Sequence, residues 1–329
     1  MGDRYASFAN SGAGRALVKR LGLPDPPPLR RYQPGDPLTG GPVLVGAAPG
    51  GRLGDAVRKL VDAGPDGPFG ALVFDATGIV ESAQLRELYE FFHPNARSLL
   101  RSGRVVVLGT PPEAAGSPKE ATAQRALEGL TRSIGKEFGR GITAQLVYVA
   151  PGGEGAIEST VRFLLSGRSA YVSGQVIRVG AGTAPPPGDA ERPLAGQTAL
   201  VTGAARGIGA AIARVLARDG AEVVALDMPA AGDALAGVAN DVRGRALQLD
   251  LTAPQAAERL AGHLGGGVDI VVHNAGITRD RTIARMDAAR WDTVLGVNLT
   301  APERITEVLL ERGLIRQRII GVASIAGIA

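Results

Sequence analysis

The second half of the chain alternates short apolar runs with longer amphipathic stretches. An apolar, β-branched run predicts a buried strand at residues 198–202, and further short runs predict strands at 222–226, 246–249, 269–273 and 318–323. Continuous apolar runs of this length are typical of strands covered on both faces. Apolar residues recur at helical spacing in the stretches 210–219, 254–263 and 287–312. Strands that alternate with helices predict an α/β fold with a doubly wound, Rossmann-like parallel sheet.

The first half repeats this pattern in a reduced form. Three pairs of segments correspond: 42–64 with 196–220, 71–79 with 269–277, and 104–110 with 318–324. We interpret the repeat as a tandem duplication in which the earlier copy has lost the segment with the second and third strands. The earlier copy is therefore predicted to be a degenerate, flavodoxin-like Rossmann domain without cofactor or catalytic motifs. Its glycine turn contains Arg52, which we expect to be a solvated surface arginine.

Proline-rich segments suggest where the domains begin and end. Closely spaced prolines in residues 1–41 predict an N-terminal arm, because proline favours extended backbone and stops helices. Residues 184–195 contain three consecutive prolines followed by charges, which is typical of a linker. These boundaries leave a degenerate domain at 42–183 and a second, incomplete domain at 196–329.

Composition and charge exclude several classes of function. The 329 residues contain no cysteine, which excludes disulfides, thiolate zinc sites and a cysteine nucleophile. The three histidines lack metal-ligand spacing. The net charge is only +4, and no basic run is interleaved with aromatic residues, so we expect no nucleic-acid partner. The chain contains no apolar run of about 18 residues, so no membrane span is predicted, and we expect a cytoplasmic protein.

A glycine-rich segment, TGAARGIG at 202–209, follows one predicted strand and opens a helix. Gly203 would permit the tight turn, Gly207 the close approach of a pyrophosphate, and Gly209 the packing of helix on strand. Arg206 and Ile208 complete the predicted nucleotide-binding loop. The helix N-terminus favours an anion because its first N–H groups have no partner within the helix. A plain glycine turn is the alternative interpretation.

Asp227 closes the next predicted strand. A carboxylate at this position can accept hydrogen bonds from both ribose hydroxyls of a dinucleotide, and it repels a 2′-phosphate. The position therefore predicts that NAD(H) is preferred over NADP(H). The alternative is an ordinary surface aspartate at the end of a strand.

These motifs resemble the short-chain dehydrogenase/reductase family. The residues that carry the resemblance are TGAARGIG, Asp227, Asp250-Leu251, Asn274-Ala275-Gly276, Asn298 and Ser324. Within that family the chain is similar to the 3-oxoacyl-[acyl-carrier-protein] reductases, and its degenerate front half resembles the large, two-domain form found in mycobacteria. The resemblance implies NADH-dependent reduction of 3-oxoacyl thioesters of acyl-carrier protein or CoA, in fatty acid biosynthesis.

The resemblance also implies a role for individual residues. Asp250 and Leu251 would contact the adenine ring, and the turn Asn274-Ala275-Gly276 would shape the nucleotide pocket. Asn298 and Ser324 are the predicted catalytic residues: Asn298 would bend the long helix and hold a relay water, and Ser324 would hydrogen-bond the substrate carbonyl. His273 replaces an asparagine of the family, and we interpret it as a structural histidine.

The family's chemistry needs two further groups, a tyrosine that donates a proton and a lysine one helical turn later. No tyrosine follows Tyr171 and no lysine follows Lys136. In the earlier copy the corresponding positions fall near Glu120 and Gln124, and Thr110 stands near the serine position. We therefore expect this chain to be a fragment that is inactive by itself.

Other interpretations remain open at the level of sequence. One is an inactive nucleotide-binding or interaction protein, and another is a reductase that acts on a different carbonyl substrate. Because family members pair through the long helix, here 287–312, the complete protein is expected to be a homodimer.

Overall fold

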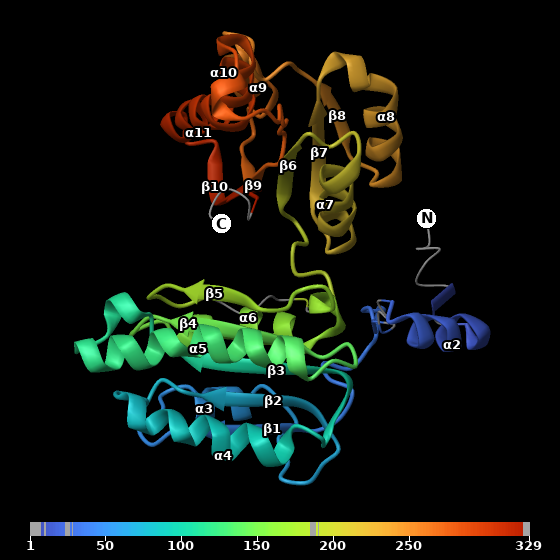
Figure 1. The fold of residues 1–329 in the computed structure, drawn as a ribbon. Helices are drawn as coiled ribbons and strands as arrows, with labels where there is room; N and C mark the ends of the chain where they lie inside the picture. The colour runs from blue at the N-terminus through green and yellow to red at the C-terminus, as the bar shows by residue number, and fades with distance from the viewer. Residues whose placement is uncertain are drawn as a thin grey trace. The chain divides into compact units, whose positions relative to one another are not determined.

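The computed structural model describes residues 8–9, 11–23, 27, 29–184, 189 and 191–324. It divides into two compact units, Met1–Pro186 and Pro187–Ala329. Each unit is built around a five-stranded sheet whose neighbouring strands are all parallel, and helices connect the strands (Figure 1). This arrangement confirms the predicted α/β class with Rossmann-like parallel sheets.

In the first unit, helix α2 (Gly12–Leu21) precedes a sheet whose strands lie in chain order. The strands are β1 (Val43–Ala47), β2 (Phe69–Asp75), β3 (Leu99–Gly109), β4 (Thr143–Val149) and β5 (Gln175–Val179). The helices between them are α3 (Gly54–Arg58), α4 (Arg86–Asn95), α5 (Pro118–Glu137) and α6 (Glu158–Leu165). Short 3₁₀ turns lie at η1 (Ser82–Leu85), η2 (Pro112–Ala114), η3 (Glu154–Ala156) and η4 (Gly167–Ser169).

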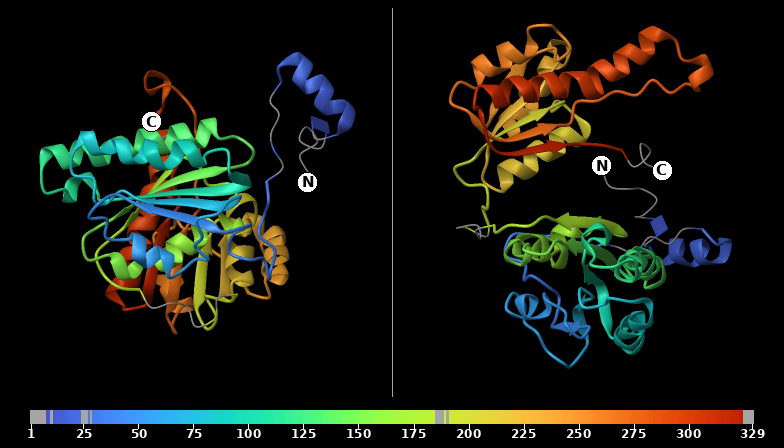
Figure 2. Two further views of the ribbon diagram at one scale, coloured as in Figure 1. Left: turned by 90° about the horizontal axis from the view of Figure 1, so that it is seen from below. Right: turned by 90° about the vertical axis from the view of Figure 1, so that its left-hand side faces the viewer.

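Both faces of the first sheet are covered. Phe74 and Leu72 pack with Leu127 of α5 on one face, whereas Val73 and Ala71 pack with Val57 of α3 on the other. Figure 2 (left) shows α4 and α5 on one side of this sheet and α3 and α6 on the other. All four connections between consecutive strands run in the same direction across the sheet. Because their helices lie on opposite faces, some of these crossovers are right-handed and others left-handed. Nearly all such crossovers in proteins are right-handed.

The flavodoxin-like interpretation of the first unit is wrong. In flavodoxin-like folds the second strand lies outside the first, in the order 2-1-3-4-5. Here β1 is an edge strand that pairs with β2, and beyond it the described residues form only an isolated bridge between Val43 and Ala63. The reason is the short connection from β1 to β2, whose only helix is α3 and which contains no strand to extend the sheet.

The second unit has the strand order β10-β9-β6-β7-β8. Its strands are β6 (Thr198–Thr202), β7 (Glu222–Asp227), β8 (Arg245–Gln248), β9 (Val268–His273) and β10 (Ile315–Gly321). These bounds confirm the five strands expected from the apolar runs. The chain moves outward from β6 to β8 and then returns to β9 on the other side of β6. In such a sheet, ligands bind at the carboxyl ends of the two strands where the order reverses, here β6 and β9.

Helices cover both faces of the second sheet as well. The helices of this unit are α7 (Gly207–Arg218), α8 (Gly232–Asp241), α9 (Ala256–His263), α10 (Ala288–Leu295) and α11 (Ala301–Glu311), with 3₁₀ turns η5 (Pro229–Ala231) and η6 (Ile283–Arg285). No residue of α10 is buried. Ala213 of α7 and Leu235 of α8 pack on one face, and Leu260 of α9 and Ile305 of α11 on the other. A π-helical turn, η7 (Gly296–Thr300), joins α10 to α11, which follow one another in a single long element (Figure 2, right).

The described ranges contain neither a membrane-spanning helix nor a cluster of metal-ligating side chains. No helix there is long and apolar enough to cross a membrane. In the same part of the chain, no group of three or more His, Asp or Glu side chains could hold a metal ion.

Candidate nucleotide-binding site

The predicted site residues of the second unit lie where its strands end. Because neighbouring strands are parallel, their carboxyl ends meet along one edge of the sheet. Gly203 follows β6, Asp227 ends β7, Asp250 follows β8, Asn274 follows β9, and Ser324 lies beyond β10. The fold therefore brings segments far apart in sequence to one edge.

Two glycines of the loop are required by close packing. Gly203 has a φ of +66°, and a Cβ there would lie 2.8 Å from the Cα of Ala275. A Cβ at Gly209 would collide with the carbonyl oxygen of Gly203 and would lie within 2.5 Å of the Asn274 Nδ2. Gly207 differs, because it has a φ of +58° and an added Cβ would meet no atom within 4 Å. The loop is thus tight at its base and open where the helix starts.

Helix α7 begins at this open position. Its N-cap residue, Arg206, is extended, with a φ of −158°, and no side chain caps the first turn. The first turn also contains no acidic residue, and Ile208 is 66% exposed. The uncapped N–H groups of this turn and the positive end of the helix dipole favour an anion near this end of the helix.

The Asp227 carboxylate is tied to the same loop. Its Oδ2 accepts a hydrogen bond from the backbone N–H of Ala205 at 2.9 Å, and its Oδ1 accepts one from Met228 at 2.8 Å. Each carboxylate oxygen has two lone pairs, so both can still accept from a ligand hydroxyl. The arrangement places one negative charge beside the loop, at the end of the neighbouring strand.

Asp250 and Leu251 form the turn that follows β8. The Asp250 Oδ1 accepts from the backbone N–H of Thr252 at 2.9 Å and from its hydroxyl at 2.7 Å. Leu251 is buried and packs with the core on the α9 and α11 face. The turn is therefore held by its own side chains.

Asn274 ties the end of β9 to the end of β6. Its Nδ2 donates to the carbonyl oxygens of Thr202, at 3.0 Å, and Gly203, at 3.1 Å. The Thr202 hydroxyl accepts from the backbone N–H groups of Asn274 and Ala275, both at 3.0 Å, and donates to the Val272 carbonyl at 3.2 Å. Sequence reasoning missed this role of Thr202, for which the signal was a polar residue closing an apolar strand.

Asn298 lies in the π-helical turn η7 and binds the segment that follows β9. Its Oδ1 accepts from the Ile277 N–H at 2.9 Å, and its Nδ2 donates to the Ile277 carbonyl at 2.9 Å. Gly276 lies next to this pair of hydrogen bonds, as a Cβ added there would be 3.5 Å from the Asn298 Oδ1. The long helix predicted over 287–312, with an expected bend at Asn298, thus has a π-helical turn at this asparagine.

Ser324 and His273 lie at the ends of the paired strands β10 and β9. The Val322 N–H donates to the His273 carbonyl at 2.9 Å, which continues the pairing toward the exposed Ser324. The His273 ring is buried, and its Nε2 is 2.9 Å from the Thr306 hydroxyl of α11. Burial lowers the pKa of His273, so the ring is neutral at physiological pH.

In the first unit, a carboxylate occupies the corresponding edge. Asp75 ends β2 and is fully buried. Its Oδ2 accepts from the N–H groups of Leu53, at 2.6 Å, and Gly54, at 2.8 Å, at the start of α3. Arg52 beside it is not the solvated arginine expected, because its guanidinium forms an ion pair with Glu154 and donates to backbone carbonyls at the end of β4. The short connection to β2 brings Arg52 against the end of β4.

Gln124 fills the interior next to Asp75. The side chain is fully buried; its Nε2 donates to the carbonyls of Ala76 and Ile79, both at 2.8 Å, and its Oε1 accepts from the Thr110 N–H at 2.8 Å. The Tyr148 hydroxyl donates to the Gln124 carbonyl at 2.8 Å, and burial raises the pKa of this phenol to about 12. Glu120, by contrast, lies in the exposed first turn of α5.

Comparison with known proteins shows which class of protein the second unit resembles. Residues 197–329 match the family model described as short chain dehydrogenase. The match supports the short-chain dehydrogenase family, a family of oxidoreductases, for this unit. Similar curated proteins include 3-oxoacyl-[acyl-carrier-protein] reductases named FabG. Those of Vibrio cholerae and Pseudomonas aeruginosa are 40% identical over 140 residues and 41% identical over 144 residues, and each alignment covers 41% of this chain.

The Escherichia coli reductase is 36% identical over 138 residues, which cover 40% of this chain. The alignments cover 57%, 58% and 56% of the Vibrio, Pseudomonas and Escherichia proteins. The chain therefore spans little more than half the length of the curated relatives it matches.

Proposed function

We propose that the second unit is the nucleotide-binding part of a short-chain reductase. The complete protein would reduce 3-oxoacyl thioesters, carried on acyl-carrier protein or CoA, to 3-hydroxyacyl thioesters. When bound, NADH would supply the hydride. The substrate class is supported by the family match and by the names of the similar reductases.

The observation that carries this proposal is the open amino end of α7 beside the Asp227 carboxylate. The N–H groups around Gly207 would bind the pyrophosphate, and Asp227 would accept from the ribose hydroxyls. Two like unit charges about 4 Å apart repel by about 4 kcal/mol at an effective dielectric constant of about 20. Because Asp227 is partly exposed, we expect solvent to screen most of this repulsion, so that only a fraction of it acts against a 2′-phosphate.

Asn298 and Ser324 would act on the substrate side. The Ser324 hydroxyl would donate to the carbonyl oxygen of the thioester's keto group, which withdraws charge from the carbon that accepts hydride. Asn298 would hold the Ile277 segment against the long helix at its π-helical turn, where backbone carbonyls depart from the usual pattern. The remaining step is protonation of the carbonyl oxygen, and no tyrosine in the 329 residues has a lysine four residues later.

For the first unit we propose a structural role without a dinucleotide. The start of α3 donates its N–H groups to Asp75, and the Gln124 side chain occupies the interior between β2 and β3. These contacts support a degenerate copy whose own side chains fill the nucleotide position. The isolated Val43–Ala63 bridge beyond β1 supports the loss of two strands after a duplication.

A second candidate is a protein that binds the nucleotide without turning over substrate. Its support is the geometry around Gly207 and Asp227, which fits nucleotide binding and does not by itself require turnover. The complete protein would be a cytoplasmic homodimer through the long helix, whose exposed Trp291 and Leu299 offer an apolar surface.

An assay of this 329-residue chain tests the proposal. We expect NADH to bind and to show no oxidation with acetoacetyl-CoA, because the proton donor is missing. NADH binding is followed by fluorescence and turnover by absorbance, with a FabG reductase as the positive control. Substantial turnover would contradict the proposed need for the tyrosine and lysine, and failure to bind NADH would contradict the proposed site itself.

A further inference from the structure

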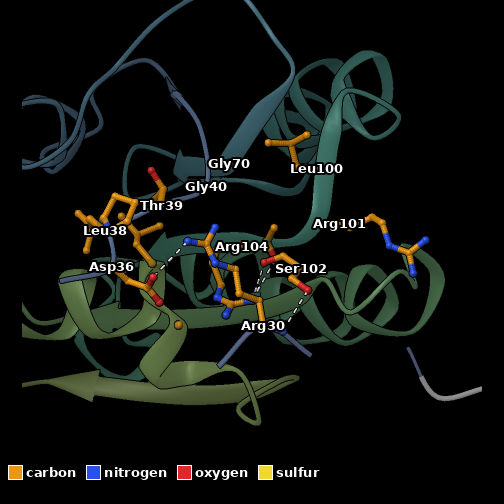
Figure 3. A pocket seen from close by; sticks show the side chains of 14 residues that line it. Arg30, Asp36, Leu38, Thr39, Gly40, Gly70, Leu100, Arg101, Ser102 and Arg104 are labelled. Carbon is orange, nitrogen blue, oxygen red and sulfur yellow. Dashed lines mark hydrogen bonds and ion pairs between the residues drawn. The ribbon is translucent and has the colours of Figure 1, made fainter. Parts of the chain in front are cut away.

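A pocket of about 290 Å³ opens in the first unit, at the amino ends of its strands (Figure 3). It lies between the segment that precedes β1, the start of β2 and the first half of β3. The nucleotide position proposed for Rossmann-like sheets lies at the opposite, carboxyl edge. The pocket therefore belongs to a different part of the fold from the site described above.

An irregularity in β3 creates the pocket wall. Phe69 of β2 pairs with Leu99 of β3, but Ala71 already pairs with Arg104, so β3 contains three additional residues at this point. Ser102 in this bulge has a φ of +55°, a left-handed conformation that costs a residue with a side chain on the order of 1 kcal/mol or more. Strained backbone of this kind persists where the surrounding structure enforces it, and it is concentrated at functional sites.

The most unusual residue of the pocket is Arg104. It is only 4% exposed, and its guanidinium donates to the Ser166 carbonyl at 3.2 Å and the Ser102 carbonyl at 2.8 Å. Within the described part of the chain, no carboxylate lies within ion-pair distance of it, and its Nη2 donates no hydrogen bond. Burial, together with the positive charge of Arg30, lowers the pKa of Arg104. A buried cation without a counter-ion is costly, so the position favours an anion.

Arg30 supplies a second guanidinium beside Arg104. It forms a long ion pair of 3.5 Å with Asp36, whose side chain is partly exposed. Figure 3 shows the two guanidinium groups close together, while Arg101 points away at the rim. Glycine at position 40 makes room for this arrangement, because a Cβ there would lie 3.1 Å from the Arg30 Nη1. Two guanidinium groups thus face one carboxylate, which leaves a positive charge unbalanced.

We propose that this pocket binds a phosphate group, held between Arg30 and Arg104. The planar guanidinium matches the oxygens of a phosphate through paired hydrogen bonds, and a dianion would balance both arginines. Leu38, Leu100 and Leu165 add apolar surface to the wall, which suits the organic part of a small phosphate ester. The inference concerns the first unit alone and does not depend on nucleotide binding by the second.

Calorimetric titration of the full chain at constant ionic strength tests this inference. Inorganic phosphate and phenyl phosphate are titrated separately, and at least one is expected to bind saturably with one site per chain. Tighter binding of phenyl phosphate identifies a phosphate ester as the ligand, and equal or tighter binding of inorganic phosphate identifies the free anion. The absence of saturable binding by both at millimolar concentrations would overturn the proposal.

Variants locate the binding. Arg30→Gln is expected to weaken phosphate binding at least tenfold. Arg104→Lys is expected to weaken it as well, because lysine keeps the charge but lacks the planar guanidinium that forms paired hydrogen bonds. Arg86→Gln, which removes the same charge from the exposed surface of α4, is the matched control and should leave the affinity unchanged. Because Arg30 is half exposed, its variant is expected to fold, which thermal denaturation checks. Equal affinity in Arg30→Gln and the unmodified chain would also overturn the proposal.

Discussion

The residues that end the strands form different contacts in the two units. In the second unit, Asn274 binds the strand ends through its amide, and the first turn of α7 stays without a side-chain cap. In the first unit, Asp75 donates no hydrogen and instead accepts from the first N–H groups of α3. The glycine motif could be predicted from sequence because its residues are contiguous. The hydrogen bonds of the Asp75 carboxylate could not be predicted, because its partners Leu53 and Gly54 are distant in sequence.

His273 provides a prediction about pH at this scale. Burial holds the pKa of the folded-state imidazole below its ordinary value of about 6.5, so the unfolded chain binds a proton first as the pH falls. The contribution of the neutral ring to stability is therefore present above about pH 6.5 and declines below it. We expect His273→Asn to make the melting temperature of the second unit less sensitive to acid.

The matched control is His263→Asn, since His263 is an exposed residue on α9. Its melting temperature should change with pH as that of the unmodified chain does. Differential scanning calorimetry between about pH 7 and pH 5.5 measures the slope, on either side of the ordinary histidine pKa. An unchanged acid slope in His273→Asn would contradict the account of the buried ring.

At the scale of elements, strands and helices could be predicted more fully than their interruptions. The short apolar runs predicted all five strands of the second sheet. Burial on both faces leaves a continuous apolar pattern in the inner strands β6, β7 and β9, whereas the edge strands β8 and β10 are mostly exposed. The long helix was expected to bend at Asn298. The π-helical turn at this position accompanies hydrogen bonds between Asn298 and Ile277, and no local sequence pattern indicates these bonds. The bulge in β3 was missed for the same reason, because it depends on register with β2.

The packing of α7 on β6 gives a second prediction. In Gly209→Ala the added methyl group would press on the Gly203 carbonyl, so α7 must shift. We expect the unfolding free energy of the second unit to fall by about 2 kcal/mol, as for overpacked sites, and the NADH affinity to fall at least tenfold. Urea denaturation and fluorescence titration measure the two effects.

Gly237→Ala on α8 is the matched control, because an added Cβ there meets no atom within 4 Å. Helix propensity should make this variant more stable by about 0.5–1 kcal/mol, with unchanged NADH affinity. If both substitutions affected NADH equally, the tight base of the glycine loop would not be the reason for binding.

At the scale of the molecule, two sheets of one class have different strand orders. The α/β class followed from alternating strands and helices, and both units have it. The order of the first sheet was not foreseen, because a missing segment in sequence does not say on which side of β1 the chain continues. With β2 directly beside β1, no strand order reverses in the first sheet, whereas the second sheet keeps the reversal beside β6 where ligands bind.

Titration of the chain with NADH and NADPH tests the central claim most directly, namely that only the second unit holds a dinucleotide and that Asp227 selects it. We predict one NADH per chain, bound at least tenfold more tightly than NADPH, which corresponds to about 1.4 kcal/mol of retained repulsion. Asp227→Ser should remove most of that preference while the protein stays folded. Two nucleotides per chain, or tighter binding of NADPH, would contradict the account.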